Sequence, residues 1–330
     1  MISKRILVIQ TAFIGDVILA TSVLETLHDG LPQAEIDFLV RKGNEPLLKG
    51  HPFIREVLTW DKKKGKYRHL WELLGLIRKK KYHYVINLQR YAATGLLTAM
   101  SGAHVRIGFD KNPLSYFFTH RIPHRMGDGR HEIERNYALL KPITDAPLQK
   151  PRLYPTNDDA KITANQHQPY LCIAPASVWF TKQFPLEKWK ELIDLIPSSH
   201  TIYIVGAPAD YELGERLIQG SEQRTIVNLC GKLSLLQSAA LMRNAVMNFV
   251  NDSAPMHLCS AVDAPVTAIF CSTVPAFGYG PLSTISHIGQ TDQPLSCRPC
   301  GLHGHRSCPE GHFKCALTID VKKLTALIPQ

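Results

Sequence analysis

The chain has 330 residues, more than a single hydrophobic core usually organises, so its length predicts two domains. Hydrophobic residues make up 45% and charged residues 20% of the composition, which excludes a disordered tail, a coiled coil and a collagen-like fibre. The formal net charge of +10 indicates an anionic partner and leaves nucleic acid, a membrane surface and a phosphorylated substrate open.

The N-terminal segment is similar to a short signal peptide, because two basic residues precede an apolar stretch at 6–14. The residues at 15–16 interrupt that stretch, so a buried first strand is the favoured interpretation. The longest stretch without charged residues, 264–291, contains several prolines and glycines and predicts no membrane-spanning helix. With no export signal, we expect a cytoplasmic protein whose cysteines are reduced.

Short apolar runs alternate with amphipathic stretches along the chain, and several of these runs are continuously apolar. The predicted strands cover 6–9, 36–40, 57–60, 84–88, 105–109, 170–174, 201–205, 225–229, 246–250 and 266–270. The predicted helices cover 17–28, 67–80, 92–101, 133–140, 186–196, 210–219, 235–242 and 254–262. This alternation predicts an α/β fold with parallel sheets that are covered on both faces.

A segment rich in proline, asparagine, aspartate and glutamine interrupts the alternation at 141–168 and is the predicted linker. We therefore expect one domain at 1–155 and a second at 156–330. Two doubly wound domains that face each other across a cleft are the simplest architecture. Ligands of such folds bind at the carboxyl ends of the strands.

The first candidate site, TAFIGDV at 11–17, follows the first predicted strand. Gly15 permits a tight turn and the close approach of a ligand, and Asp16 would lie at the lip of the cleft. The competing interpretation is an acid that complements the helix dipole, and the residues alone favour it. Because neither half opens with G-x-G-x-x-G, a nicotinamide-dependent oxidoreductase is only a distant alternative.

The second candidate site, APASVWFTK at 174–182, follows the first strand of the second half. Small residues, a hydroxyl group and Lys182 placed after a strand can hold a phosphate. The Walker A spacing is absent, and a surface loop with a solvated lysine is an equally good interpretation.

The third candidate site, VNDSAPMHL at 250–258, joins a predicted strand directly to a predicted helix. Asn251, Asp252 and Ser253 are all good N-cap residues, and the N-terminus of the helix offers free N–H groups to an anion. Capping alone accounts for Asp252 or Ser253 and explains less well why so many polar residues gather at one strand end.

A cysteine-rich segment near the C-terminus is a candidate metal site. Four thiols interleaved with histidines could hold a tetrahedral zinc ion: Cys297, Cys300, Cys308 and Cys315. The spacing of two paired C-x-x-C knuckles is not met, so a reduced surface loop is the alternative, and the sequence leaves the two open.

A basic segment at 62–81 contains nine lysines and arginines and a single acid, Glu72. Aromatic residues are interleaved with it: Trp60, Tyr67, Trp71 and Tyr82. This combination suits a membrane interface or an anionic acceptor. Nucleic acid is a weaker candidate, because no helix-turn-helix, RRM or zinc-finger pattern accompanies the segment.

Taken together, these motifs resemble glycosyltransferase family 9, the ADP-heptose:lipopolysaccharide heptosyltransferases. The segments that carry the resemblance run along nearly the whole chain. They are ILVIQTAFIGDVILATSVLETL near the start, VRIGFD at 105–110, HEIERNYALL at 131–140, APASVWFTKQFPLEKW at 174–189, NDSAPMHLCSAVDAPVTAIF at 251–270 and CRPCGLHGHRSCPEGHFKC at 297–315. The last of them is more similar to the branch that contains the second heptosyltransferase than to the first.

The resemblance implies a GT-B fold, in which 1–155 is a Rossmann-like acceptor-binding domain and 156–330 a Rossmann-like donor-binding domain. It implies inverting transfer of a heptose from ADP-heptose to the inner core of lipopolysaccharide, with no cofactor and no catalytic metal. Asp16 is then the catalytic base, and Gly15 and Arg90 bind the acceptor.

The resemblance also implies a set of donor-binding residues: Ser177, Lys182, Asp210, Asp252, Ser253, Ala254 and His257. Ala254 stands where glycine is common in the family, and its methyl group slightly reduces the room for the diphosphate. Lys182 and the N–H groups at 253–254 would stabilise the departing ADP. Because a carboxylate at a helix N-terminus has a lowered pKa, we expect Asp16 to be a weak base.

We accordingly expect ADP-heptose, the anionic lipopolysaccharide core and the inner-membrane surface as partners, and no nucleic acid. The protein would be cytoplasmic and peripheral at the inner face of the inner membrane. One alternative is a family member that uses another nucleotide-sugar for a different surface glycan. A second, of a different class, is a basic, zinc-containing nucleic-acid-binding protein.

Overall fold

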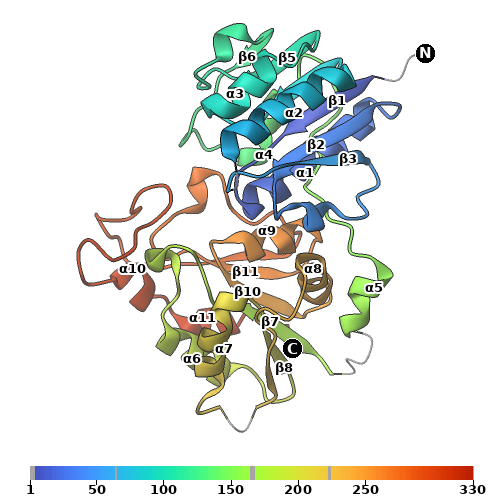
Figure 1. The fold of residues 1–330 in the computed structure, drawn as a ribbon. Coiled ribbons are helices and arrows are strands. Elements are labelled where there is room, and N and C mark those ends of the chain that lie inside the picture. Colours follow the sequence, from blue (N-terminus) through green and yellow to red (C-terminus); the bar gives the residue numbers. More distant parts are fainter. Residues whose placement is uncertain (1–3, 64, 164–167, 222–223, 330) are drawn as a thin grey trace. The chain divides into compact units, whose positions relative to one another are not determined.

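The computed structural model describes residues 4–63, 65–163, 168–221 and 224–329. The chain divides into two compact units, Met1–Tyr154 and Pro155–Gln330, which we call unit 1 and unit 2. Each unit contains a six-stranded sheet. Figure 1 shows helices on both faces of each sheet. The prediction of an α/β fold built from doubly wound parallel sheets is thereby confirmed.

The sheet of unit 1 has the strand order β3-β2-β1-β4-β5-β6, and every described pairing in it is parallel. Its strands are β1 (Arg5–Ile9), β2 (Glu35–Arg41), β3 (Ile54–Trp60), β4 (Tyr84–Asn87), β5 (Val105–Phe109) and β6 (His120–Ile122). Its helices are α1 (Ile14–Gly30), α2 (Lys66–Lys80), α3 (Ala92–Ala99) and α4 (Glu132–Ala138). The chain winds outward in both directions from β1 and β4, so the crevice between the loops that follow these two strands is where a ligand of this topology binds.

The core of unit 1 explains why its first strand reads as a continuous apolar run. Ile6, Leu7, Val8 and Ile9 are completely buried, because helices cover both faces of the sheet. Leucines of α2 and α3 pack on one face, while α1 and α4 lie side by side.

Unit 2 repeats this winding, with the strand order β12-β11-β10-β7-β8-β9 and again only parallel described pairings. Its strands are β7 (Tyr170–Ala174), β8 (Thr201–Ile204), β9 (Ile226–Asn228), β10 (Met247–Asn251), β11 (Val266–Ile269) and β12 (Ser286–Gly289). Its helices are α5 (Asn157–Ala160), α6 (Leu186–Leu195), α7 (Tyr211–Ile218), α8 (Leu235–Arg243), α9 (Ala254–Ala261), α10 (Lys314–Leu317) and α11 (Val321–Thr325). The corresponding crevice of unit 2 lies between the loops that follow β7 and β10.

The structure contains elements that were not predicted, among them the short helices α5, α10 and α11. The edge strands β6 and β12 were not predicted, because both are short and partly exposed and so have no continuous apolar run. Helix α1 begins at Ile14, three residues before the predicted start, so Gly15 and Asp16 belong to its first turn.

The predicted linker at 141–168 is in part fixed to unit 1. The backbone N–H of Gln149 donates to Thr26 Oγ1 at 3.1 Å, and that of Arg152 donates to Thr21 Oγ1 at 2.9 Å. Both threonines lie on α1, so side-chain acceptors satisfy the backbone at 149–152, where the segment forms no regular structure. The part of the prediction at 164–167 lies outside the described residues.

Candidate active site

Asp16 lies at the carboxyl edge of the sheet in unit 1, where the chain passes from β1 into α1. The main-chain N–H of Phe13 donates to Asp16 Oδ2 at 3.2 Å, so the carboxylate caps the start of the helix. Gly15 precedes it in the same turn. The structural interpretation of Asp16 as a first-turn acid is therefore correct, and it does not exclude a second role.

The electrostatics of Asp16 contradict the expectation of a lowered pKa. Burial raises the pKa of the carboxyl group above its usual value. Hydrogen bonds from the N–H groups of Phe13 and of Asp16 itself, and the charge of Arg90, act in the opposite direction with smaller effect. Because loss of hydration outweighs the helix terminus, Asp16 is a stronger base than the sequence suggests.

Arg90 follows β4, and the structure brings its exposed side chain close enough to affect the ionisation of Asp16. A buried pair accompanies them at the start of α4, where Arg135 Nε donates to Glu132 Oε2 at 2.9 Å. Burial raises the pKa of Glu132, and the charge of Asp16 contributes in the same direction. Neither Glu132 nor Arg135 was assigned to the site, although the alternation of acids and an arginine in HEIERNYALL was the available signal.

Lys62 reaches the same edge of the sheet from the end of β3. Its Nζ donates to the backbone oxygen of Thr11 at 2.7 Å and lies 4.8 Å from the centroid of the Trp60 ring. Burial, with a smaller contribution from the charge of Arg41, lowers the pKa of Lys62 to about 8. Thr11 Oγ1 in turn donates to Gln89 Oε1 at 2.7 Å, so the loops that follow β1, β3 and β4 are tied together.

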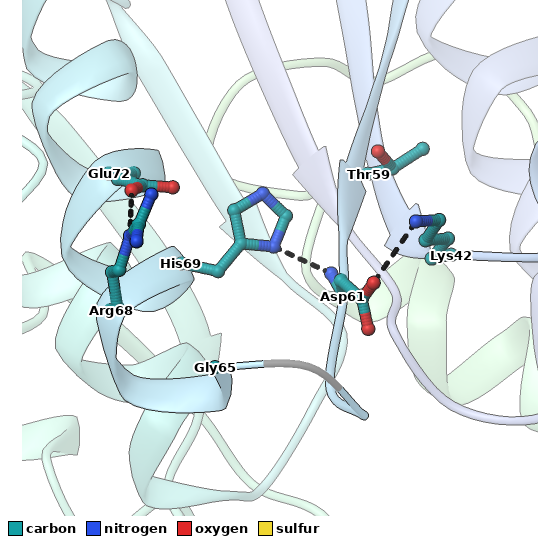
Figure 2. A pocket seen from close by; sticks show the side chains of 7 residues that line it. All are labelled: Lys42, Thr59, Asp61, Gly65, Arg68, His69 and Glu72. Carbon is teal, nitrogen blue, oxygen red and sulfur yellow. Dashed lines mark hydrogen bonds and ion pairs between the residues drawn. The ribbon is translucent and has the colours of Figure 1, made fainter.

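A pocket of about 490 Å³ lies beside this edge, where the end of β3 meets the start of α2. Figure 2 shows Asp61 between Lys42 and His69: Lys42 Nζ lies 3.1 Å from Asp61 Oδ2, and His69 Nδ1 accepts the N–H of Asp61 at 2.8 Å. Arg68 Nε donates to Glu72 Oε1 at 2.8 Å. Two cations and two carboxylates therefore cancel in formal charge within the pocket. Its lining is Lys42, Thr59, Asp61, Gly65, Arg68, His69 and Glu72.

The aromatic residues in and beside the basic segment at 62–81 differ in exposure: two are buried and two are exposed. Trp60 and Tyr82 are each only 2% exposed and belong to the core, so the idea that they join an aromatic face is wrong. Tyr67 is 71% and Trp71 56% exposed, one helical turn apart on α2. Lys64, part of the predicted segment, lies outside the described residues.

Two predicted donor-binding residues meet at the carboxyl edge of the sheet in unit 2. Lys182 Nζ lies 2.7 Å from Asp252 Oδ2, and both side chains are largely buried. Thr273 Oγ1 donates to the same carboxylate oxygen at 2.6 Å. The three residues follow β7, β10 and β11, so the winding of the sheet assembles them from distant parts of the sequence.

The N-terminus of α9 begins directly after Asp252. Ser253 is its N-cap residue, but the Ser253 side chain makes no capping hydrogen bond, and its Oγ donates instead to Asn251 O at 3.3 Å. The interpretation of Asp252 or Ser253 as a plain cap is therefore wrong. Ala254 opens the helix, whose first-turn N–H groups receive no side-chain oxygen from the cap.

The remaining predicted donor residues lie at the same edge or just below it. Ser177 is half-buried in the loop after β7, and its carbonyl accepts Gln183 Nε2 at 2.6 Å. Asp210 follows β8 and accepts the backbone N–H of Ala207 at 2.7 Å. His257 is buried on α9. The structure thus brings Lys182 and Asp252 into direct contact, whereas Asp210 is engaged by its own turn.

Asn251 was not assigned to the site, although it ends a buried strand. Its Nδ2 donates to Pro175 O at 2.7 Å, and its Oδ1 accepts the N–H of Phe184 at 3.0 Å. One side chain therefore holds both ends of the loop that carries Lys182.

Most of the cysteine-rich segment is an irregular loop of unit 2, while Cys315 lies on α10, and Cys297, Cys300, Cys308 and Cys315 are free thiols. Cys297 Sγ lies 3.9 Å from His312 Nε2. Within the part of the chain that the structure describes, no group of three or more histidine, cysteine, aspartate or glutamate side chains is arranged to hold a metal ion. Among the same residues, no helix has both the length and the apolar character needed to cross a bilayer.

Comparison with known proteins identifies the family. The model of glycosyltransferase family 9 (heptosyltransferase) matches residues 70–302. Lipopolysaccharide heptosyltransferase 3 of Escherichia coli strain K12 is 27% identical over 278 residues, which are 78% of this chain and 80% of that protein. Lipopolysaccharide heptosyltransferase 1 of Pseudomonas aeruginosa is 27% identical over 314 residues, 90% of this chain and 86% of that protein.

A solved structure agrees with the fold. That of the E. coli ADP-heptose lps heptosyltransferase II superposes with a TM-score of 0.76 over 98% of each chain at 24% identity. Because these three proteins represent three differently numbered heptosyltransferases, the similarity to the second branch stays a prediction. The family model covers well over half of the sequence, and the chain belongs to glycosyltransferase family 9, the heptosyltransferase family.

Proposed function

We propose that this glycosyltransferase moves a heptose from ADP-heptose to the inner core of lipopolysaccharide, with inversion at the anomeric carbon. Unit 2 would bind the donor, and unit 1 would bind the acceptor. The names of the relatives support the substrates, since both curated proteins are lipopolysaccharide heptosyltransferases.

The observation that carries the donor assignment is the meeting of a cation with an uncapped helix N-terminus at the crevice of unit 2. The ammonium group of Lys182 forms an ion pair with Asp252, the residue that precedes the N-cap of α9. A diphosphate placed there would receive a positive charge and main-chain N–H groups together. Both would stabilise the negative charge that gathers on ADP as it leaves, without a metal ion.

In this proposal Asp16 is the base of the reaction. Asp16 takes the proton of the acceptor hydroxyl while the hydroxyl oxygen bonds to the anomeric carbon. The bond from that carbon to the diphosphate oxygen breaks, and ADP leaves with its electron pair. A single in-line displacement inverts the configuration, and the raised pKa of Asp16 suits a group that must hold the proton.

The acceptor would approach along the edge of unit 1 that carries Arg90 and Lys62. We propose that the exposed face of α2 meets the inner face of the inner membrane. Tyr67, Trp71 and Arg78 share that face, since they are spaced by four and seven residues and all are exposed. An aromatic and basic face of this kind binds anionic lipid surfaces.

The membrane assignment is tested by sedimentation with vesicles of phosphatidylglycerol and of phosphatidylcholine. We expect binding to the anionic vesicles only, weakened by Trp71→Ser and by Arg78→Glu. Lys322→Glu changes the charge of an exposed residue of unit 2 equally and serves as the control. Equal binding by all variants would remove α2 from the membrane contact.

The function is tested by turnover of ADP-heptose with a panel of truncated core acceptors, read by mass spectrometry. A heptose added to one acceptor is the expected product. Thermal shifts with ADP, UDP and GDP distinguish the alternative, another nucleotide-sugar, because only the correct nucleotide should stabilise unit 2 strongly.

A further inference from the structure

A second loop of unit 2 holds the loop that carries Lys182. We call residues 297–313 the cysteine-rich loop and residues 174–182 the lysine loop. Thr181 belongs to the lysine loop and is almost completely buried. Its N–H donates to His305 O at 3.1 Å, and its Oγ1 accepts the N–H of His305 at 2.7 Å. The residue next to Lys182 is therefore fixed by hydrogen bonds with His305 of the cysteine-rich loop.

A second connection runs through the segment that follows β11. Arg298 donates to three backbone carbonyls of that segment, those of Phe270, Cys271 and Thr273, at 3.1, 2.8 and 2.9 Å. Thr273 in turn donates its hydroxyl hydrogen to Asp252, the partner of Lys182. The cysteine-rich loop thus fixes the carboxylate that holds Lys182 as well as the backbone of Thr181, the residue before Lys182.

The contact between the loops has no spare room at Gly304. A methyl group added there would lie 2.8 Å from Thr181 Oγ1, 3.0 Å from Lys182 Cγ and 3.3 Å from Ser272 Oγ. Ser272 Oγ itself donates to Thr181 Oγ1 at 3.1 Å, so this side of the lysine loop is closely packed. Phe180 stacks on Phe313 at the far end of the cysteine-rich loop, with ring centroids 5.1 Å apart.

We propose that the cysteine-rich loop positions Lys182 for the donor diphosphate, with Gly304, His305 and Arg298 as its positioning residues. The inference rests on the proposed function, in which Lys182 binds the diphosphate. A lysine side chain has several rotatable bonds, and holding it in one place before the ligand arrives lowers the entropic cost of binding. Loosening the cysteine-rich loop should therefore act on donor binding and leave the acceptor side unchanged.

The test compares alanine at two glycines of the same loop. Gly304 and Gly311 both have left-handed backbones, with φ of +75° and +69°, but among the residues that the structure describes no contact within 4 Å is made by a methyl group on Gly311. Both substitutions strain the backbone similarly, and only Gly304→Ala pushes on Thr181 and Lys182. We expect Gly304→Ala to weaken ADP binding at least about fivefold and to raise the donor KM to the same degree, whereas Gly311→Ala stays within about twofold.

A double-mutant cycle shows whether the effect passes through Lys182. In a Lys182→Met background, Gly304→Ala should change ADP affinity no further, because the ammonium group that it would displace is absent. An undiminished effect would mean that Gly304 acts on the donor site by another route and would overturn the proposal. Acceptor KM should be unchanged in all of these variants.

Thr181 provides the same test without strain, should Gly304→Ala not fold. Thr181→Val keeps the shape of the side chain and removes the hydroxyl group that accepts from His305. It should weaken ADP binding, and Thr181→Ser should restore it. Equal ADP affinity of the valine and serine variants would count against the proposal.

The outcomes separate this inference from the proposed function. If Lys182→Met leaves ADP affinity unchanged, the donor site itself has been assigned wrongly. If Lys182→Met weakens ADP binding but Gly304→Ala matches Gly311→Ala, the donor site stands and the positioning role is wrong.

Discussion

The two units place corresponding loops at corresponding points. In each sheet the first and fourth strands of the unit are neighbours, and the loops that follow them meet at the carboxyl edge. In unit 1 the first of these loops leads to Asp16 and the second carries Arg90. In unit 2 the first carries Lys182 and the second leads to Asp252. The same winding therefore presents an acid near an exposed arginine in one unit and a lysine paired with an acid in the other.

The two units differ in the surroundings of these charged groups, Asp16 in unit 1 and Lys182 in unit 2. Asp16 is desolvated, and the side chain of Arg90 is exposed, so the acid keeps a raised pKa and remains able to accept a proton. Lys182 forms an ion pair with Asp252 at 2.7 Å, so its position is fixed. A base must exchange a proton during the reaction, whereas a diphosphate-binding cation needs only to be in the right place. The same fold can therefore position either a base or a diphosphate-binding cation. Which of the two it positions depends on the partner of the charged side chain in the loop after the first strand.

The largest effect should come from Asp16→Asn, which tests whether the crevice of unit 1 provides the base of the reaction. The amide has the size of the carboxyl group but cannot take the proton. We expect kcat to fall by about 10²- to 10⁴-fold. ADP affinity, measured by calorimetry, should stay unchanged because unit 2 is untouched. Near-normal transfer would remove Asp16 as the base.

Lys182→Ala tests the crevice of unit 2 in the same way. Loss of a charged hydrogen-bond donor should weaken ADP binding by about ten- to a hundredfold, since such bonds contribute roughly 1.5–3 kcal/mol. The matched control is Lys62→Ala, which removes a half-buried lysine from the edge of unit 1. If both variants bound ADP equally, the assignment of the donor to unit 2 would be wrong.

The predictions from the sequence succeed where a pattern reports directly on burial. The continuous apolar run at 6–9 correctly predicts a strand covered on both faces, and the motifs after β7 and β10 correctly place polar residues at strand ends. The pKa of Asp16 was predicted in the wrong direction, because the sequence shows a helix start but not how little water reaches it. Thr273 and Arg298 could not be predicted as neighbours of the site, since only the folded loops bring them there. Thr273 contacts Asp252, and Arg298 contacts the backbone of the segment that follows β11.

A smaller effect should appear in the pH dependence of kcat, which tests the raised pKa of Asp16. Asp16 acts when ionised, so the rate falls as the pH drops through its raised pKa. The charge of Arg90 lowers that pKa, so Arg90→Met should raise it further and move the acidic limb of the profile to higher pH. Profiles of kcat against pH at saturating acceptor measure the shift. Lys182→Met is the control variant, and its acidic limb should not move. A limb that stays in place or moves to lower pH in Arg90→Met contradicts this account of Asp16.

The smallest effect concerns two serines at helix starts in unit 2. Ser234 Oγ accepts the N–H of Gln237 at 3.1 Å and caps α8, whereas Ser253 has no such bond at the start of α9. Ser234→Ala should therefore lower the free energy of unfolding by about 1 kcal/mol, and Ser253→Ala should change it by less than about 0.5 kcal/mol. Urea unfolding without nucleotide measures both. A Ser253→Ala loss as large as that of Ser234→Ala would show that α9 is capped after all. Its N–H groups would then be occupied, and unit 2 would keep Lys182 alone to bind the diphosphate.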